Sequence, residues 1–372
     1  MKIITVLGAR PQFVKAATIS RAIKQHNKKV DSKHYLDEVI VHTGQHFDAN
    51  MSQVFFDQLD IPHPDYNLGV ANLSHGAMTG KMLGSIEELV LKEKPDWLLV
   101  YGDTNSTLAG ALSAIKLQIP IIHIEAGLRS YNPNMPEEIN RILTDRISTI
   151  LFCPTQNAVE NLLSEGFPYL APGSREQIIS NVGDVMFDAV LYYRDQARKD
   201  VSLQSWDVEE KEYVLCTLHR QENTDDPVRL EGILSALREI SNDSKVLLPL
   251  HPRTRKMLGE QKRLNLLDGL QVLDPVPYIE MQRLEMGANL ILTDSGGMQK
   301  EAFFHGVPCI TLRDETEWVE TVDLGWNYVV GAQVESIIRA RDALKKPPET
   351  KAKPYGDGSA ASKIISIINE CS

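Results

Sequence analysis

Three acidic side chains stand at predicted strand or helix ends in the first half of the chain. Asp103 follows the apolar run 97–101, Glu125 follows the run 119–124, and Glu137 opens an amphipathic segment. The carboxyl ends of neighbouring parallel strands meet at one edge of a sheet, where ligands bind. Three carboxylates at one such edge are costly to desolvate unless they are used or paired.

Each of these carboxylates, taken alone, also has a structural explanation. Asp103 is placed to cap a helix N-terminus, and Glu137 can serve the start of the next helix. Glu125 can pair with Arg129, four residues further on. Only the occurrence of all three in one predicted sheet favours a functional site.

Basic residues follow the strands predicted in the second half. His219 and Arg220 come shortly after the run 213–217, and His251 comes directly after the run 246–250. These side chains supply positive charge at a sheet edge, as a small polyanionic ligand requires.

A glycine pair joins the next predicted strand, 290–293, to a helix. Gly296 and Gly297 let backbone N–H groups approach a diphosphate, whose charge the helix N-terminus favours. Glu301, about one turn later, can accept hydrogen bonds from ribose hydroxyls, and Ser295 precedes the glycines. The alternative for such a segment alone is an ordinary tight turn.

The first predicted turn, residues 8–15, carries Arg10 and Lys15 but not the G-x-G-x-x-G spacing of a dinucleotide site. The chain contains no Walker A loop and no G-x-S-x-G motif. His42 and His46 are four residues apart, yet Thr-Gly-Gln between them disfavours a helical metal motif. We therefore expect neither a metal ion nor a dinucleotide cofactor.

Short apolar runs alternate with amphipathic segments along the chain, which is typical of parallel sheets with crossover helices. The predicted strands are 3–7, 38–42, 97–101, 119–124, 150–153, 213–217, 246–250, 290–293, 309–312 and 328–330. We expect an α/β fold with two Rossmann-like domains. The first domain spans 1–175 and is joined by the C-terminal helical segment 356–372, and the second spans 176–355.

The composition agrees with a globular protein of two domains. The 372 residues exceed what one core usually organises, and 42% are hydrophobic and 24% charged. A net charge of −11 argues against nucleic-acid binding. The four cysteines are scattered, and no run approaches the roughly 20 apolar residues of a membrane span, so we expect a cytoplasmic protein with reduced thiols.

Taken in order, these motifs resemble those of the non-hydrolysing UDP-N-acetylglucosamine 2-epimerases. The segments that carry the resemblance are 8–15, 43–46, 102–104, 123–129, 136–141, 219–220, 294–301 and 355–358. The resemblance implies a glycosyltransferase-B-like arrangement of the two domains with an interdomain cleft, a UDP-sugar substrate and a homodimer.

The resemblance also implies roles for particular residues. Asp103, Glu125 and Glu137 would be the catalytic carboxylates, and His219 would act near the leaving diphosphate. The residues expected to bind the nucleotide sugar are Arg10, Lys15, Arg220, His251, Ser295, Gly296, Gly297, Glu301 and Arg313.

Three segments depart from the family pattern. Gln12 replaces an acidic residue, 251–253 replaces a His-x-Asn-Pro, and 316–320 reads Thr-Glu-Trp-Val-Glu instead of Thr-Glu-Arg-Pro-Glu. These variants look like the branch acting on UDP-2,3-diacetamido-glucuronic acid, and Arg253, Arg255 and Lys300 would suit a carboxylated sugar. Gln45 and His46 match an allosteric UDP-sugar pattern of bacterial members, from which Asp48 departs.

Other functions fit part of the pattern. A glycosyltransferase of the same fold shares the glycine pair and the ribose glutamate but does not require three carboxylates. A non-catalytic sugar-nucleotide-binding regulator is a further alternative.

Overall fold

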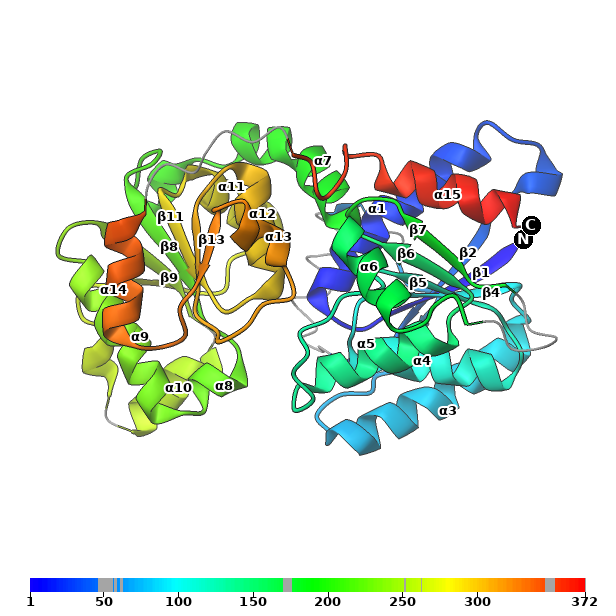
Figure 1. Cartoon of the computed structure of the whole chain (residues 1–372), viewed down its shortest axis with the longest axis horizontal. Helices are drawn as coiled ribbons and strands as arrows, with labels where there is room; N and C mark the ends of the chain where they lie inside the picture. The colour runs from blue at the N-terminus through cyan, green and yellow to red at the C-terminus, as the bar shows by residue number, and fades with distance from the viewer. Residues whose placement is uncertain are drawn as a thin grey trace. The chain divides into compact units, whose positions relative to one another are not determined.

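The chain consists of two compact units, each described here by itself (Figure 1). Unit 1 comprises Met1–Ala189 with Lys353–Ser372, and unit 2 comprises Val190–Ala352. A computed structural model describes residues 1–45, 56, 59–60, 63–169, 176–250, 252–261, 263–344 and 352–371. The division comes later than the boundary expected after residue 175, because Ile178–Asn181 still pairs with the sheet of unit 1.

Unit 1 is built on a parallel sheet. Its strands are β1 (Lys2–Leu7), β2 (Asp37–His42), β3 (Tyr66–Asn67), β4 (Trp97–Tyr101), β5 (Ile121–Ile124), β6 (Ile150–Cys153) and β7 (Ile178–Asn181). They lie in the order β3-β2-β1-β4-β5-β6-β7.

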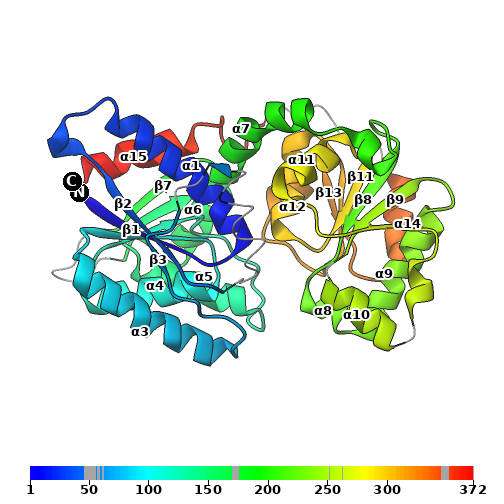
Figure 2. The same ribbon diagram turned by 180° about the vertical axis from the view of Figure 1, so that it is seen from behind.

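The helices of unit 1 cover both faces of this sheet. They are α1 (Arg10–Asn27), α3 (His75–Glu93), α4 (Asn105–Lys116), α5 (Pro136–Ile147), α6 (Gln156–Ser164), α7 (Val185–Asp200), which continues into unit 2, and α15 (Ala360–Glu370), with a 3-10 turn at Ser32–His34. Helices α1 and α15 lie together on one face, and α3, α4 and α5 form a row on the other (Figures 1 and 2). The C-terminal segment is fixed by Asp188, whose carboxylate accepts the Ala360 and Ala361 amides at 3.1 and 2.8 Å.

Unit 2 repeats the plan with a second parallel sheet. Its strands are β8 (Tyr213–Thr217), β9 (Lys245–Pro249), β10 (Gln271–Leu273), β11 (Leu290–Thr293), β12 (Cys309–Thr311) and β13 (Asn327–Val329), in the order β10-β9-β8-β11-β12-β13. Its helices are α8 (Gln221–Thr224), α9 (Pro227–Ile240), α10 (Pro252–Glu260), α11 (Tyr278–Gly287), α12 (Gly296–His305), α13 (Val319–Asp323) and α14 (Val334–Ala343), with 3-10 turns at Leu203–Trp206 and Leu264–Leu267.

Both faces of the second sheet are packed. Along β8, Val214 and Cys216 belong to the core cluster that contains α9 residues, whereas Tyr213 and Leu215 belong to the cluster on the α11 and α12 side. Successive side chains of a strand point to opposite faces, so both must be apolar when helices cover both. This is why the central strands read as continuous apolar runs.

The strand order reverses at one place in each sheet. In unit 1 the chain turns away from β1 in both directions, to β2 and to β4, and in unit 2 it does so from β8, to β9 and to β11. The loops that follow such central strands diverge to opposite faces, which leaves room for a ligand at the carboxyl edge. A ligand is therefore expected to bind at the residues after β1, β4, β8 and β11.

The predicted α/β class with two parallel sheets is confirmed, and all ten predicted strands are present with small shifts at their ends. Three further strands, β3, β7 and β10, lie at sheet edges and escaped prediction. The expectation about how the two domains are arranged stays a prediction. In the described part of the chain, no helix combines the length and apolarity that crossing a bilayer demands.

His42, the last residue of β2, is 1% exposed and packs edge-on against Phe13, with ring centroids 5.1 Å apart. Burial lowers its pKa to about 4. The folded protein thus favours the neutral ring, and the unfolded chain, with a histidine pKa near 6.5, binds the extra proton first.

Stability should be complete above about pH 6.5 and fall as the pH drops towards 4, by about 2 kcal/mol at pH 5 from this residue. Denaturant unfolding of His42→Gln at pH 7 and pH 5 should show a smaller fall than the wild type by about that amount. An equal fall in both proteins would contradict the prediction.

Candidate active site

Glu125 stands directly after β5 and pairs with Lys15 of α1. Its backbone adopts φ 72°, a left-handed conformation that is unusual outside glycine, and its amide donates to the Phe152 carbonyl of β6 at 3.0 Å. The Lys15 ammonium contacts the Glu125 carboxylate, and the two side chains are 7% and 11% exposed. The sequence-based alternative that Glu125 pairs with Arg129 is therefore wrong.

Arg129 instead points to two other carboxylates. Its guanidinium donates to both oxygens of Glu165, at 2.6 and 2.8 Å, and to Asp145 at 2.7 Å. Asp145 is buried, which raises its pKa, but hydrogen bonds and charges from His123 and Arg129 outweigh burial and bring the pKa below its ordinary value. Asp145 is thus held as an ion, and Glu125 is left to Lys15.

Asp103 occupies the turn between β4 and α4. Gly102 before it has φ 60°, a conformation that L side chains rarely adopt, and Thr104 after it caps α4. The predicted alternative, that Asp103 itself is the cap, is wrong. Its carboxylate is partly exposed and lies 3.2 Å from Nη2 of Arg141, while its carbonyl accepts the Asn140 amide at 2.9 Å.

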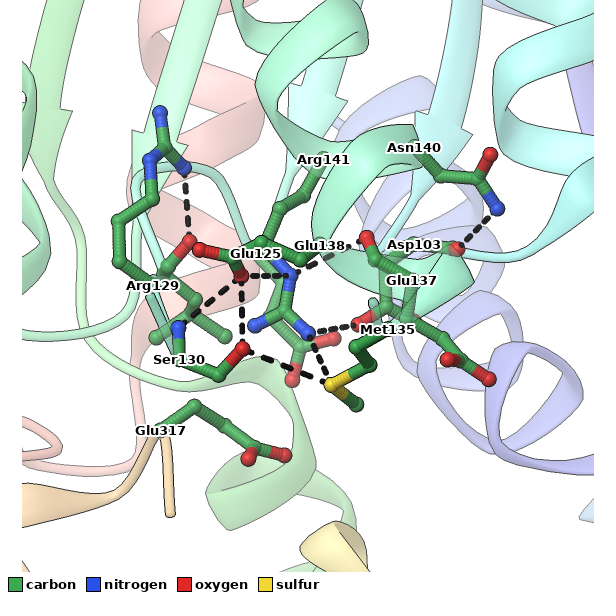
Figure 3. Close-up of polar contacts among 12 residues, drawn as sticks. Asp103, Glu125, Arg129, Ser130, Met135, Glu137, Glu138, Asn140, Arg141 and Glu317 are labelled. Carbon is green, nitrogen blue, oxygen red and sulfur yellow. Dashed lines mark hydrogen bonds and ion pairs between the residues drawn. The ribbon is translucent and has the colours of Figure 1, made fainter. Parts of the chain in front are cut away.

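Arg141 of α5 joins Asp103 to a second carboxylate (Figure 3). Its Nε lies 3.3 Å from Glu138, which also accepts the Ser130 amide at 3.0 Å, the Ser130 hydroxyl at 3.1 Å and the Tyr131 amide at 2.9 Å. Glu138 is thus fully occupied in fixing the loop before α5. Sequence reasoning noted Arg141 within its motif but gave it no role.

Glu137, the neighbour of Glu138, is differently placed. It lies in the first turn of α5, where the helix dipole favours a negative charge. Within the described residues, its carboxylate makes no hydrogen bond or ion pair, so it is available to a ligand. Its catalytic role stays a prediction.

Gln12 ties the turn after β1 to the end of β4. Its side-chain oxygen accepts the Gly8 and Ala9 amides at 2.8 and 3.0 Å, and its amide donates to the Tyr101 carbonyl at 2.7 Å. An amide can donate and accept at once, which a carboxylate cannot. The family departure at this position therefore has a structural use here.

Lys15 and Glu125 also line a small cavity at the carboxyl edge of the sheet, together with Val182, Gly183 and Asp184. The edge thus combines two carboxylates, each paired with one buried cation. Such groups can exchange protons with a bound substrate.

In unit 2, Asp294 organises the turn after β8. It is fully buried and accepts the backbone amides of His219 at 3.2 Å and Arg220 at 3.1 Å, and the Asn223 amide at 3.2 Å. Nδ1 of His219 lies 3.3 Å from Asp294, and the ring is 53% exposed. With Nδ1 held by Asp294, Nε2 is the ring nitrogen left for a ligand.

Helix α12 begins at the predicted phosphate-binding turn. Ser295 is its N-cap, with the hydroxyl accepting the Met298 amide at 3.4 Å. A Cβ on Gly296 would lie 2.4 Å from Oε1 of Glu317, so a larger residue there requires the Glu317 side chain to move. Arg313, 1% exposed, holds Glu317 at 3.0 Å. Its predicted contact with substrate stays a prediction.

The remaining predicted ligand residues differ in their placement. Glu301 is 8% exposed within α12. Lys300 is buried with its ammonium 3.9 Å from the centre of the Trp318 ring, whereas Arg255 is exposed on α10. His46, Asp48 and His251, and the side chains of Arg10 and Arg253, lie outside the described residues.

Comparisons with known proteins agree on one family. Residues 28–369 match the family described as UDP-N-acetylglucosamine 2-epimerase. The UDP-2,3-diacetamido-2,3-dideoxy-D-glucuronate 2-epimerase of Pseudomonas aeruginosa is 55% identical over 370 residues, covering 99% of each chain.

Solved structures are similar over the whole chain. The UDP-GlcNAc 2-epimerase of Methanocaldococcus jannaschii, in complex with UDP-GlcNAc and UDP, matches with a TM-score of 0.89, 43% identity and 100% coverage of both chains. The UDP-GlcNAc 2-epimerase of Neisseria meningitidis bound to UDP-GlcNAc matches with a TM-score of 0.86, 29% identity and the same coverage.

The Arg141 pairs generate a stability prediction. Arg141→Met leaves the buried Glu138 without its cation, which should cost about 3–5 kcal/mol of unfolding free energy. The double variant with Glu138→Gln should lose less than the sum of the two single changes, because no uncompensated charge remains. Denaturant unfolding measures both.

Arg146→Met on the same helix is the matched control. Its exposed guanidinium lies over the Tyr169 ring, 4.2 Å from the centre, and its loss should cost less than about 1 kcal/mol. Equal losses for Arg141→Met and Arg146→Met would refute the assignment.

Proposed function

Because the chain belongs to the UDP-N-acetylglucosamine 2-epimerase family, we propose that it inverts C2 of a UDP-2-acetamido sugar by eliminating UDP and adding it back. The observation that carries this mechanism is the pair of carboxylates at neighbouring strand ends. Asp103 follows β4 and is held by Arg141, and Glu125 follows β5 and is held by Lys15.

The chemistry explains why carboxylates are needed. The C2–H bond of a 2-acetamido sugar is not acidic, because no carbonyl is attached to C2. Departure of UDP takes the C1–O electron pair and leaves positive character at C1. A carboxylate then removes the C2 proton, a C1=C2 double bond forms, and the product is a glycal plus UDP.

The reverse steps complete the inversion. A carboxylic acid on the other face returns a proton to C2, and the diphosphate oxygen re-forms its bond to C1. Asp103, Glu125 and Glu137 are the groups we assign to these proton transfers. His219, whose Nδ1 is held by Asp294, donates to the leaving diphosphate, and the N-terminus of α12 binds it.

Two sugars are candidates for the natural substrate. The named activities of the relatives are on UDP-GlcNAc and on UDP-2,3-diacetamido-2,3-dideoxy-D-glucuronate. The second is favoured by the 55% identity with the Pseudomonas aeruginosa enzyme, against 44% with the Methanocaldococcus jannaschii enzyme. Separate assays with the two sugars decide between them, because a single preferred substrate will show the larger kcat/KM.

A homodimer is part of the proposal. Ile139, Ile142 and Leu143 are 42–48% exposed and share one face of α5, at a spacing that gives a continuous apolar stripe. A second copy of the chain would cover it. The cytoplasmic location expected from the sequence also stays a prediction.

Solvent exchange at C2 tests the elimination mechanism. Product formed in deuterium oxide should carry deuterium at C2, because the glycal is reprotonated by a group that exchanges with water. Turnover should persist with a chelator and without added NAD. Mass spectrometry of epimerised product lacking deuterium, or activity that depends on NAD, would overturn the mechanism.

Removing each carboxylate charge tests the assignments. Asp103→Asn, Glu125→Gln and Glu137→Gln should each lower kcat by about 10²–10⁴ while calorimetry shows UDP binding largely retained. Glu160→Gln, exposed on α6 of the same unit, is the control and should retain full activity. Near-normal turnover in all three site variants would exclude these residues as catalysts.

A further inference from the structure

His123 is a fully buried histidine that the proposed mechanism leaves unused. It lies within β5, with Nδ1 2.7 Å from an oxygen of Asp145 and Nε2 2.7 Å from the Gly102 carbonyl. A carbonyl oxygen only accepts, and an ionised carboxylate only accepts. Nε2 therefore donates to the Gly102 carbonyl, and Nδ1 lies against the Asp145 carboxylate.

The Asp145 carboxylate of α5 accepts hydrogen bonds from two further donors. Its second oxygen accepts the Gly127 amide at 3.2 Å and the Arg129 guanidinium at 2.7 Å. The charges around it hold its pKa below the ordinary value, despite burial. One buried carboxylate thus fixes the His123 ring and the loop that follows β5.

The Gly102 carbonyl belongs to the same peptide group as the Asp103 amide. This peptide also packs close to the other catalytic turn, since a Cβ on Gly102 would lie 3.0 Å from Oε2 of Glu125. Peptide groups are planar, so a rotation of the Gly102 carbonyl must move the start of Asp103. The hydrogen bond from His123 opposes such a rotation.

We propose that His123 is a positioning residue for the epimerase reaction, which holds the Asp103 turn against Glu125 through its Nε2 donor to Gly102, with Asp145 fixing the ring. This inference rests on the proposed function for its kinetic consequence. Its geometric content, a ring that bridges Asp145 and Gly102 with Nε2 as the donor to Gly102, does not depend on that function.

Two substitutions distinguish the roles of the two His123 ring nitrogens. The amide of His123→Gln reaches the place of Nε2 and can still donate to Gly102, whereas that of His123→Asn reaches only the place of Nδ1. We expect kcat to fall about 10²-fold in His123→Asn and less than about 10-fold in His123→Gln, with KM within about threefold in both, because misplaced catalytic groups slow the chemical step.

A matched control replaces a half-buried carboxylate elsewhere in unit 1. Glu38 accepts the Thr5 hydroxyl at 2.7 Å and the Ser20 hydroxyl at 2.6 Å, and Glu38→Gln should lower the midpoint of thermal unfolding without changing kcat. Unfolding midpoints of all variants exclude simple misfolding. Equal kcat losses in His123→Asn and His123→Gln, at comparable stability, would overturn the positioning role.

Nitrogen-15 NMR of the histidine-labelled wild-type protein gives a readout independent of turnover. The chain has ten histidines, and the His123 signals are those absent from the spectrum of His123→Gln. A proton on Nε2 is expected, and an Nε2 without a proton would overturn the inference. Wild-type protein inactive on both sugars would refute the proposed function instead, and the ring protonation would still decide the geometry.

Discussion

The burial of both faces of each parallel sheet is the constraint on which the rest of this structure depends. Strands covered on both sides accept almost only apolar side chains, so ionisable groups gather where the strands end. His123 is an ionisable residue inside β5, and its burial is tolerated because both ring nitrogens have hydrogen-bond partners, Asp145 and the Gly102 carbonyl.

Two carboxylates at the edge of the first sheet are paired with cations. Asp103 is held by Arg141 and Glu125 by Lys15, and each cation comes from a helix next to the strand end. Each ion pair offsets part of the cost of holding a carboxylate charge in this partly buried environment. Arg141 also contacts Glu138, which anchors the loop before α5 by accepting three further hydrogen bonds.

Unit 2 has the same architecture, but its sheet edge presents basic side chains instead of carboxylates. A buried carboxylate, Asp294, accepts backbone amides and so presents His219 and Arg220 rather than itself. The helix N-terminus at Ser295 adds partial positive charge beside it. The edge of the first sheet thus carries paired carboxylates, and the edge of the second carries basic side chains and a helix N-terminus. The proposed mechanism assigns proton transfer to the first group and diphosphate binding to the second.

The sequence alone determined the fold class, the central strands and the residues at their carboxyl ends, because central strands must be apolar and the polar residues after them are conspicuous. It missed β3, β7 and β10, since edge strands are short and only half buried and lack an apolar run. Only the tertiary structure decided which charged side chains pair with each other. Glu125 pairs with Lys15, 110 residues away, rather than with Arg129 nearby. Folding brings the Lys15 side chain of α1 to the residue after β5 and turns Arg129 to Asp145 and Glu165.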